Sequence, residues 1–246
     1  MEKRTVCRRR WKKYFPWSFR HRKVAILLVE CGMCLLLFVV FLSERGGVFP
    51  TNAQAGKAWE EETKKVAITF DDGPHPIYTK QLLDGLDERG VKATFFVTGI
   101  NAERYPEIIR EISRQGHLIG NHTYYHTQLT GGNLETFKEE IFKTNELLKE
   151  LTGEEILYIR PPYGSWNKAV EKDLNMFPVL WSVDPLDWCS TSVSCIVQSV
   201  MAKVRENDVI LLHDHYPSTV TAALKIVDKL TAQGYRFVTV DEILFD

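Results

Sequence analysis

The sequence is poor in cysteine, and it lacks internal repeats and low-complexity tracts. Five cysteines are spread over 246 residues, and only Cys189 and Cys195 lie beyond residue 65. Two cysteines six residues apart do not form the doubled CxxC pattern of a zinc site. A local disulfide between them in an oxidising compartment stays open, because sequence does not give the Cα separation. A chain of this length can bury one substantial core, so a single folded domain is expected.

Net charge is also nearly absent, at −1, but the charges are unevenly distributed. Residues 1–23 contain ten lysines and arginines against one acid, Glu2. The basic excess therefore belongs to a terminal tail, and we expect no nucleic-acid partner.

Charged residues are scarce in residues 24–42, where Glu30 is the exception. These nineteen residues match the length of a helix that crosses the hydrocarbon core of a bilayer. The basic residues before them predict a cytoplasmic N-terminus by the positive-inside rule. We therefore expect a single-pass signal anchor in the cell membrane, with the rest of the chain on the extracytoplasmic side.

The chain that follows is expected to begin with a flexible linker, residues 43–65, before a domain at residues 66–246. A signal peptide cleaved after Ala55 is the alternative, because Ala53-Gln54-Ala55 fits a small-x-small cleavage site. The uncleaved anchor is favoured, since this site lies far beyond the apolar stretch.

Apolar runs and helical patterns alternate along the domain. Strands are predicted at residues 66–70, 93–97, 117–120, 157–160, 179–183, 209–212 and 237–238. Helices are predicted near residues 78–88, 105–115, 134–151, 192–204 and 220–233. This alternation predicts an α/β fold with a parallel sheet, and about seven strands in a chain this short favour a distorted (β/α) barrel.

Polar residues with catalytic potential follow the predicted strands directly, at the end of a parallel sheet where active sites lie. Asp71 and Asp72 follow the first strand, in Thr-Phe-Asp-Asp-Gly-Pro. Adjacent carboxylates repel each other, so they require a metal ion or an arginine nearby. His122 and His126 follow the third strand, and imidazoles four apart on a helical turn could bind one ion with a carboxylate as third ligand.

Three further segments contribute to the same edge of the sheet. Arg160 begins Arg-Pro-Pro-Tyr-Gly, whose prolines fix the backbone so that the N–H of Tyr163 could point at an oxyanion. Asp187 lies in a segment that offers a carboxylate to pair with Arg160, and the adjacent Trp188 offers a wall for a sugar ring. His213 ends the apolar sixth strand, where the neighbouring Asp214 could orient it and keep it protonated as a general acid.

These five segments, in this order, resemble the five motifs of the polysaccharide deacetylase family, carbohydrate esterase family 4. The resemblance covers residues 66–245 and implies a distorted (β/α) barrel. It also implies a catalytic role for each matching residue. The implied set is Asp71 as general base, Asp72, His122 and His126 as ligands of one divalent metal ion, His213 as general acid, Tyr163 as oxyanion donor, Arg160 as the arginine that orients the base, Asp187 as its acidic partner, and Trp188 and Leu211 as the pocket for the acetyl methyl group.

The metal is expected to be Zn²⁺, although Co²⁺, Mn²⁺, Ni²⁺ or Fe²⁺ could occupy two histidines and a carboxylate. The expected substrate is an N-acetylated polysaccharide just outside the membrane, peptidoglycan N-acetylglucosamine first, then chitooligosaccharides or another surface glycan, and less readily an O-acetyl ester. A monomer is expected. Two rival interpretations are an iron oxygenase, which also uses two histidines and one carboxylate, and a non-catalytic carbohydrate-binding module.

Overall fold

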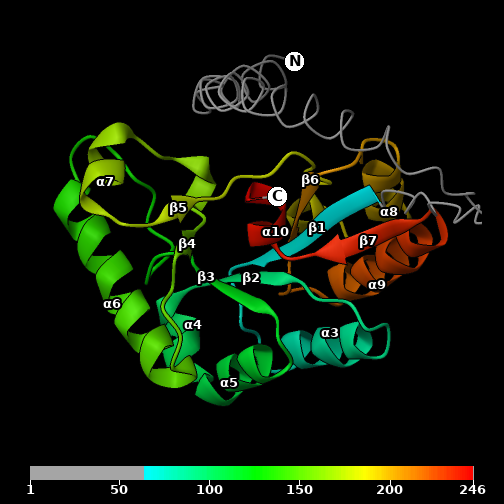
Figure 1. Cartoon of the computed structure of the whole chain (residues 1–246), viewed down its shortest axis with the longest axis horizontal. Coiled ribbons are helices and arrows are strands. Elements are labelled where there is room, and N and C mark those ends of the chain that lie inside the picture. The colour runs from blue at the N-terminus through cyan, green and yellow to red at the C-terminus, as the bar shows by residue number, and fades with distance from the viewer. Residues whose placement is uncertain (1–63, 246) are drawn as a thin grey trace, which may run out of the picture. The chain divides into compact units, whose positions relative to one another are not determined.

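A computed structural model of the protein describes residues 64–245. A sheet of seven parallel strands forms its centre, and helices surround the strands (Figure 1). The strands are β1 (Lys64–Asp71), β2 (Thr94–Val97), β3 (Leu118–Asn121), β4 (Tyr158–Ile159), β5 (Phe177–Pro178), β6 (Asp208–His213) and β7 (Tyr235–Val238).

The helices follow the strands in alternation, as the sequence predicts, with several short additions. They are α3 (Tyr78–Asp87), α4 (Gly99–Arg104), α5 (Pro106–Arg114), α6 (Leu134–Thr152), α7 (Lys168–Asp173), α8 (Val193–Met201), α9 (Pro217–Ala232) and α10 (Val240–Leu244), with 3-10 turns η1 (Pro162–Gly164) and η2 (Asp187–Cys189). The short elements α4, α7 and α10 are absent from the prediction, because five or six residues carry too little periodicity to be recognised.

The strand order is β5-β4-β3-β2-β1-β6, and β7 pairs with the first half of β1. The prediction of an α/β fold with about seven parallel strands is therefore confirmed. The sheet forms a half-barrel rather than a closed barrel, because its outer strands β5 and β6 do not pair with each other. A single bridge between Val183 and Ile210 joins the chain after β5 to β6.

One predicted strand, residues 179–183, is wrong. The strand is β5, Phe177–Pro178, and the following residues cross from β4 to β6. The N–H of Val179 still donates to Ile159 in β4, whereas Val183 already pairs with β6. Between them, the guanidinium of Arg160 donates to the carbonyls of Val179 and Leu180. A side chain thus occupies the position where backbone pairing would continue.

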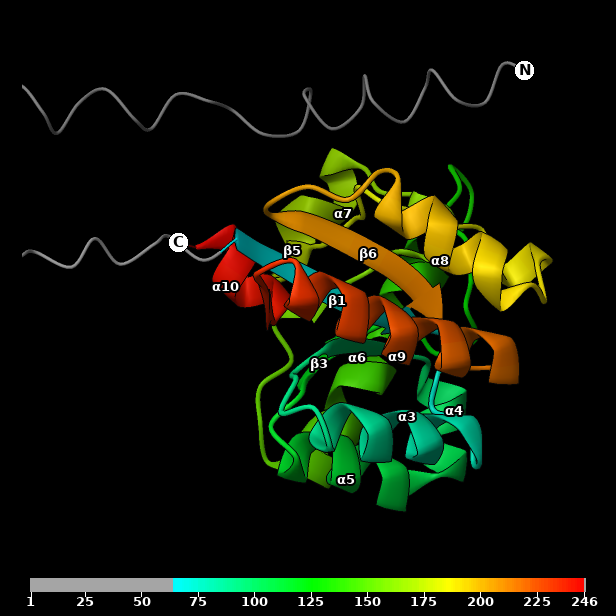
Figure 2. The ribbon, with the colours of Figure 1, turned by 90° about the vertical axis from the view of Figure 1, so that its right-hand side faces the viewer.

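Alternation along the strands separates two apolar cores. In β1, Val66, Ile68 and Phe70 face the surrounding helices and belong to the larger core. Ala67 faces the inside of the half-barrel and belongs to a smaller core with Phe96, Tyr158 and Val209 of neighbouring strands and with Val240 of α10. Helix α10 covers this apolar interior at the end where β6 begins (Figure 2). The inner face is therefore closed by apolar residues at one end, which leaves the other end for polar ones.

Two boundary predictions need comment. Lys64 and Lys65 begin β1 rather than ending a linker, because they pair with Tyr235 and Arg236 of β7. None of the helices between residues 64 and 245 is long and apolar enough to cross a membrane. The tail at 1–23, the predicted anchor at 24–42 and most of the linker lie outside the described residues.

Candidate active site

A pocket of about 670 Å³ lies at the carboxyl ends of the strands. All of the residues proposed from the sequence as metal ligands, base, acid or pocket wall line it, as does Tyr163; Arg160 and Asp187 lie buried behind it. The lining residues are Asp71, Asp72, Thr98, Ile100, Asn101, His122, Tyr125, His126, Tyr163, Trp181, Asp184, Trp188, Leu211, His213, His215 and Tyr216. This is the end of the sheet where the sequence places the site.

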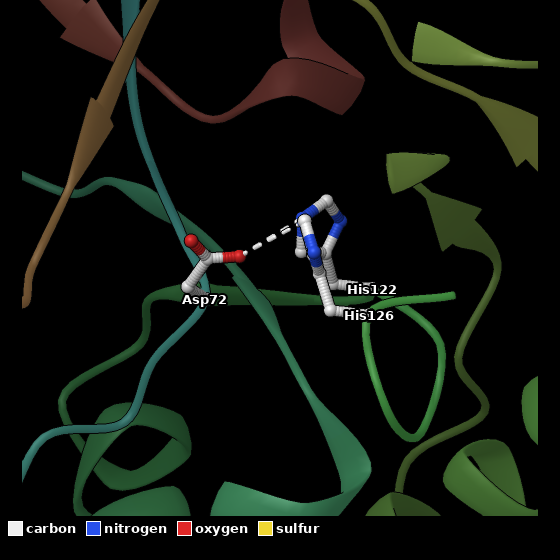
Figure 3. Close-up of side chains that lie close together, drawn as sticks. All are labelled: Asp72, His122 and His126. Carbon is white, nitrogen blue, oxygen red and sulfur yellow. Dashed lines mark ion pairs between the residues drawn. The ribbon is translucent and has the colours of Figure 1, made fainter. Parts of the chain in front are cut away.

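Three of these side chains form a candidate metal site (Figure 3). The Nε2 atoms of His122 and His126 each lie 3.3 Å from Oδ1 of Asp72. The three ligand atoms all lie within 4.8 Å of one another. Two imidazoles and one carboxylate that converge in this way fit a divalent ion and leave coordination positions open.

The local backbone that brings the two histidines together differs from the prediction. Residues 122–126 form a loop rather than a helical turn. Thr123 and His126 have φ angles of 62° and 59°, in the left-handed region. The prediction that both imidazoles approach one carboxylate is confirmed, but the i, i+4 spacing on a helix is the wrong reason.

Burial and charge favour an ion in this triad. Oδ1 of Asp72 is buried and has no hydrogen-bond partner within the described part of the chain, as expected of an atom reserved for a cation. Burial alone would raise the pKa of Asp72, but His122 and His126 outweigh it and hold this pKa well below its usual range. Burial also lowers the pKa of His126, which favours the neutral imidazole that binds metals.

His122 is oriented from behind. Its Nδ1 atom lies 2.5 Å from the carbonyl oxygen of Arg160, so Nδ1–H donates and Nε2 is left for the triad. Such a contact fixes the tautomer of a metal-binding histidine.

Asp71 lies beside this triad and is held by a buried arginine. The Nη1 atom of Arg160 donates to Oδ1 of Asp71 at 2.7 Å, and to Oγ1 of Thr69 at 2.6 Å. Oδ2 of Asp71 lies 3.8 Å from Nε2 of His122. Arg160 is fully buried, so its charge stays close to Asp71 and keeps one carboxylate oxygen oriented toward the pocket.

His213 and Asp187 form a second charged pair. The strand register aligns His213 with Asp71 on neighbouring β6 and β1. Asp187 is buried, its Oδ1 lies 2.9 Å from Nδ1 of His213, and its Oδ2 accepts from the backbone N–H of His213 and from Thr219. Burial alone would lower the pKa of His213, but Asp187 reverses the effect and raises it to about 9. The imidazole is therefore protonated at neutral pH.

Two predicted pairings are corrected by this geometry. Asp187 pairs with His213 and Thr219 rather than with Arg160, whose carboxylate partner is Asp71. Asp214 does not orient His213, because its side chain points away and accepts from Thr79. Successive residues of a strand point to opposite faces, so the neighbour in sequence faces away from the pocket.

The three remaining predicted residues lie at the pocket wall. Leu211 is buried in β6, whereas Trp188 is 56% exposed at the rim. Tyr163 has a φ of 57°, and its ring meets the ring of His126 edge-on at 4.8 Å. The thiol of Cys189, next to Trp188, and that of Cys195 are both free and exposed, so no disulfide links them.

Sequence reasoning missed the contribution of β2 and α4. The side-chain amide of Asn101 donates to the backbone carbonyl of Asp72 at 2.8 Å, and Thr98 lies beside it in the lining. Both follow a predicted strand end, so the rule that located the other residues could have identified them. His215 and Tyr216 were also overlooked, beyond His213 in the loop after β6.

Comparisons with known proteins agree with this site. A family model described as polysaccharide deacetylase matches residues 59–179. A peptidoglycan-N-acetylglucosamine deacetylase of Bacillus cereus is 42% identical over 185 residues, which cover 71% of this chain and 66% of that protein. A second B. cereus protein of the same name is 40% identical, covering 76% of this chain and 92% of its own length.

The peptidoglycan-N-acetylmuramic acid deacetylase PdaC of Bacillus subtilis is 38% identical, over 73% of this chain and 38% of its own length. Its solved structure superimposes with a TM-score of 0.72 at 37% identity, covering 74% of this chain and 91% of the solved chain. The chain thus spans less than two thirds of some relatives and nearly all of another. On these similarities, the chain belongs to the polysaccharide deacetylase family.

Proposed function

We propose that the chain is a metal-dependent hydrolase that removes N-acetyl groups from N-acetylglucosamine residues of a polysaccharide, with peptidoglycan as the substrate. One observation carries the proposal: Asp71 and His213 lie in register on adjacent strands, in the same pocket as the Asp72, His122 and His126 triad. A base, an acid and a cation site around one pocket are the groups that amide hydrolysis requires.

Each side chain has one task in the proposed reaction. A divalent ion held by Asp72, His122 and His126 would supply Lewis acidity toward the acetamide carbonyl, and Zn²⁺ suits this donor set. Asp71, oriented by Arg160, accepts a proton from the attacking water. The backbone N–H of Tyr163 donates to the developing oxyanion. His213, kept protonated by Asp187, donates a proton to the departing amine nitrogen.

The substrate assignment is supported by the pocket rim and the relatives. Tyr125, Tyr163 and Trp188 line the pocket and are each more than half exposed, which suits stacking on sugar rings. Trp188 and Leu211 would flank the acetyl methyl group. The relatives named above act on peptidoglycan, at N-acetylglucosamine or at N-acetylmuramic acid. The proposed base, acid and metal ligands all come from one chain, so the proposed reaction does not require a second subunit.

The two rival functions explain fewer of the residues in and behind the pocket than the proposed hydrolase does. An iron oxygenase would need the two histidines and Asp72, but not a protonated His213 fixed by Asp187. A carbohydrate-binding module would need the exposed aromatic rings but neither the Asp71–Arg160 pair nor the triad.

Acetate release by the purified full-length chain tests the proposal. Peptidoglycan and N-acetylglucosamine oligomers are offered to the metal-stripped protein, to the zinc-loaded protein and to the zinc-loaded Asp71→Asn variant. We expect release from peptidoglycan only with metal, and a loss of at least a hundredfold in the variant, which should still bind zinc. Acetate release from oligomers but not from peptidoglycan would overturn the substrate assignment. Release from neither, with zinc bound, would overturn the proposal that the protein is a hydrolase.

We also propose that the enzyme is anchored in the cell membrane with its catalytic domain outside. The basic residues 1–23 and the apolar residues 24–42 support this topology. Protease added to intact cells stripped of wall should digest the domain, while a cytoplasmic marker protein survives. Survival of the domain until the cells are lysed would reverse the orientation, and recovery of a soluble chain that begins at residue 56 would replace the anchor with a cleaved signal peptide.

A further inference from the structure

A buried carboxyl group beside the pocket has no role in the reaction proposed above. Asp214 follows His213 directly and is completely buried. Its Oδ2 atom accepts a hydrogen bond from Oγ1 of Thr79 in α3. Its Oδ1 atom lies 3.8 Å from Nδ1 of His215 and has no hydrogen-bond partner within residues 64–245. Burial raises the pKa of Asp214 to about 7. A buried polar group with an unmet hydrogen-bonding capacity destabilises the fold, so its presence calls for a compensating function.

The carboxyl group of Asp214 packs against the loop that carries the metal ligand Asp72. A Cβ atom added to Gly73 would lie 2.6 Å from both carboxylate oxygens of Asp214. Gly73 does not have a positive φ, so the left-handed conformation that favours glycine is not the reason for glycine at this position. Glycine is therefore required here by the space that Asp214 fills rather than by the turn itself.

Thr79 extends the contact to the other end of the same loop. Its hydroxyl donates to Asp214 and accepts the backbone N–H of His75 at 2.7 Å. Asp214 thus touches Gly73 directly and reaches His75 through Thr79. The residues just after Asp72 are thus held at two points by Asp214, which directly follows His213 at the end of β6.

We propose that Asp214 is a positioning residue that fixes the loop after β1, which carries Asp72, against the end of β6, which carries His213. The proposal rests on the proposed function, because the contact would fix the distance between Asp72, a proposed metal ligand, and His213, the proposed general acid. Without this contact the Asp72 carboxylate would lose its alignment with His122 and His126. Groups that orient metal ligands from behind typically change metal affinity by about 10- to 100-fold when removed.

Zinc affinity of the full-length chain, measured by competition with a chromophoric chelator, tests the proposal independently of acetate release. We expect Asp214→Ala and Gly73→Ala each to weaken zinc binding by about 10- to 100-fold. Because removing the carboxyl group makes room for a Cβ at residue 73, the double variant should bind zinc more tightly than the product of the two losses predicts. Asp228→Ala, which removes an exposed carboxylate bonded to Arg89, is the matched control and should bind zinc like the wild type.

Thr79→Val provides a second route if Asp214→Ala does not fold. It keeps the volume of the side chain but removes the hydroxyl, and we expect a smaller loss of zinc affinity together with a lower kcat for acetate release. Wild-type zinc affinity in Asp214→Ala or, failing its folding, in Thr79→Val would overturn the proposal, as would fully multiplicative losses in the double variant. A wild-type chain that binds zinc but releases no acetate would refute the proposed function alone, since the zinc measurements still judge Asp214.

Discussion

At the scale of single residues, Arg160 connects more of the site than any pattern in the sequence suggests. Its guanidinium donates to Asp71 and Thr69 in β1 and to the carbonyls of Val179 and Leu180 beyond β5. It also lies over the ring of Phe96, with its central carbon 4.2 Å from the ring centre. One side chain therefore orients the proposed base and closes part of the half-barrel wall.

Replacing Arg160 by methionine should destabilise the protein strongly. The variant keeps a long side chain but leaves the buried carboxylate of Asp71 without its charged partner, which costs about 3–5 kcal/mol of unfolding free energy. Denaturant titration measures the change. Arg114→Met, which breaks an exposed pair with Glu111, is the control and should leave stability unchanged. Equal stability of the two variants would contradict this account of Arg160.

Asp187→Asn should move the alkaline limit of activity to lower pH. The proposed role of His213 as general acid requires a protonated imidazole, and its pKa of about 9 keeps it protonated at neutral pH. Activity that needs the proton is therefore present below that pKa and is lost as pH rises through it. Asparagine removes the negative charge that raises the pKa, so the loss should begin at lower pH. The profile of kcat/KM against pH, at equal metal loading, measures the shift, and an unmoved alkaline limb would show that His213 is not the acid.

At the scale of elements, the ends of β1 and β6 show how adjacent residues come to serve one pocket. Asp71 ends β1 and faces inward by strand alternation. Asp72 would face outward if the strand continued, but its φ of 73° turns the chain and returns its carboxylate to the pocket. Asp214 has no such turn and stays outside. The conformation of one residue thus decides whether the second carboxylate reaches the candidate metal site.

The sequence predicted the strands and the residues at their ends better than it predicted how those residues pair. Apolar runs located β1, β2 and β6, and the motif order located the residues at the ends of β1 and β6. The partner of His213 could not be identified from the sequence, because Asp187 lies 26 residues away in the chain, in the 3-10 turn η2. The crossing of residues 179–183 from β4 to β6 was hidden for a similar reason, since Arg160 replaces backbone hydrogen bonds there.

The C-terminus of α6 offers a test of backbone conformation away from the site. Gly153 caps the helix with a φ of 77°, and a Cβ added there would meet no atom within 4 Å. Gly153→Ala should therefore lower the free energy of unfolding by about 1 kcal/mol through backbone strain alone. Gly131→Ala, also in open space but without a positive φ, should cause no loss. Denaturant midpoints compare the two, and an equal effect would exclude strain as the cause.

At the scale of the whole molecule, metal binding should stabilise the fold. The ligands come from the loops after β1 and β3, which are far apart in the sequence, so the unfolded chain does not present them together. Zinc at a hundredfold above its dissociation constant should add about 2.7 kcal/mol to the free energy of unfolding. Thermal unfolding with zinc and with chelator measures the gain. Asp72→Asn should lose it, and an equal gain in that variant would place the zinc elsewhere.

The half-barrel is incompletely paired between β5 and β6, and this should affect which part of the structure opens locally. The chain between β4 and β6 joins β6 only near Val183, and Trp181 and Asp184 of this stretch line the pocket. Strand β1, by contrast, is paired along both sides. Amide hydrogens of residues 179–183 should therefore exchange with solvent deuterium well before those of β1. The part of the pocket wall formed by residues 179–183 is therefore expected to open before the part formed by β1.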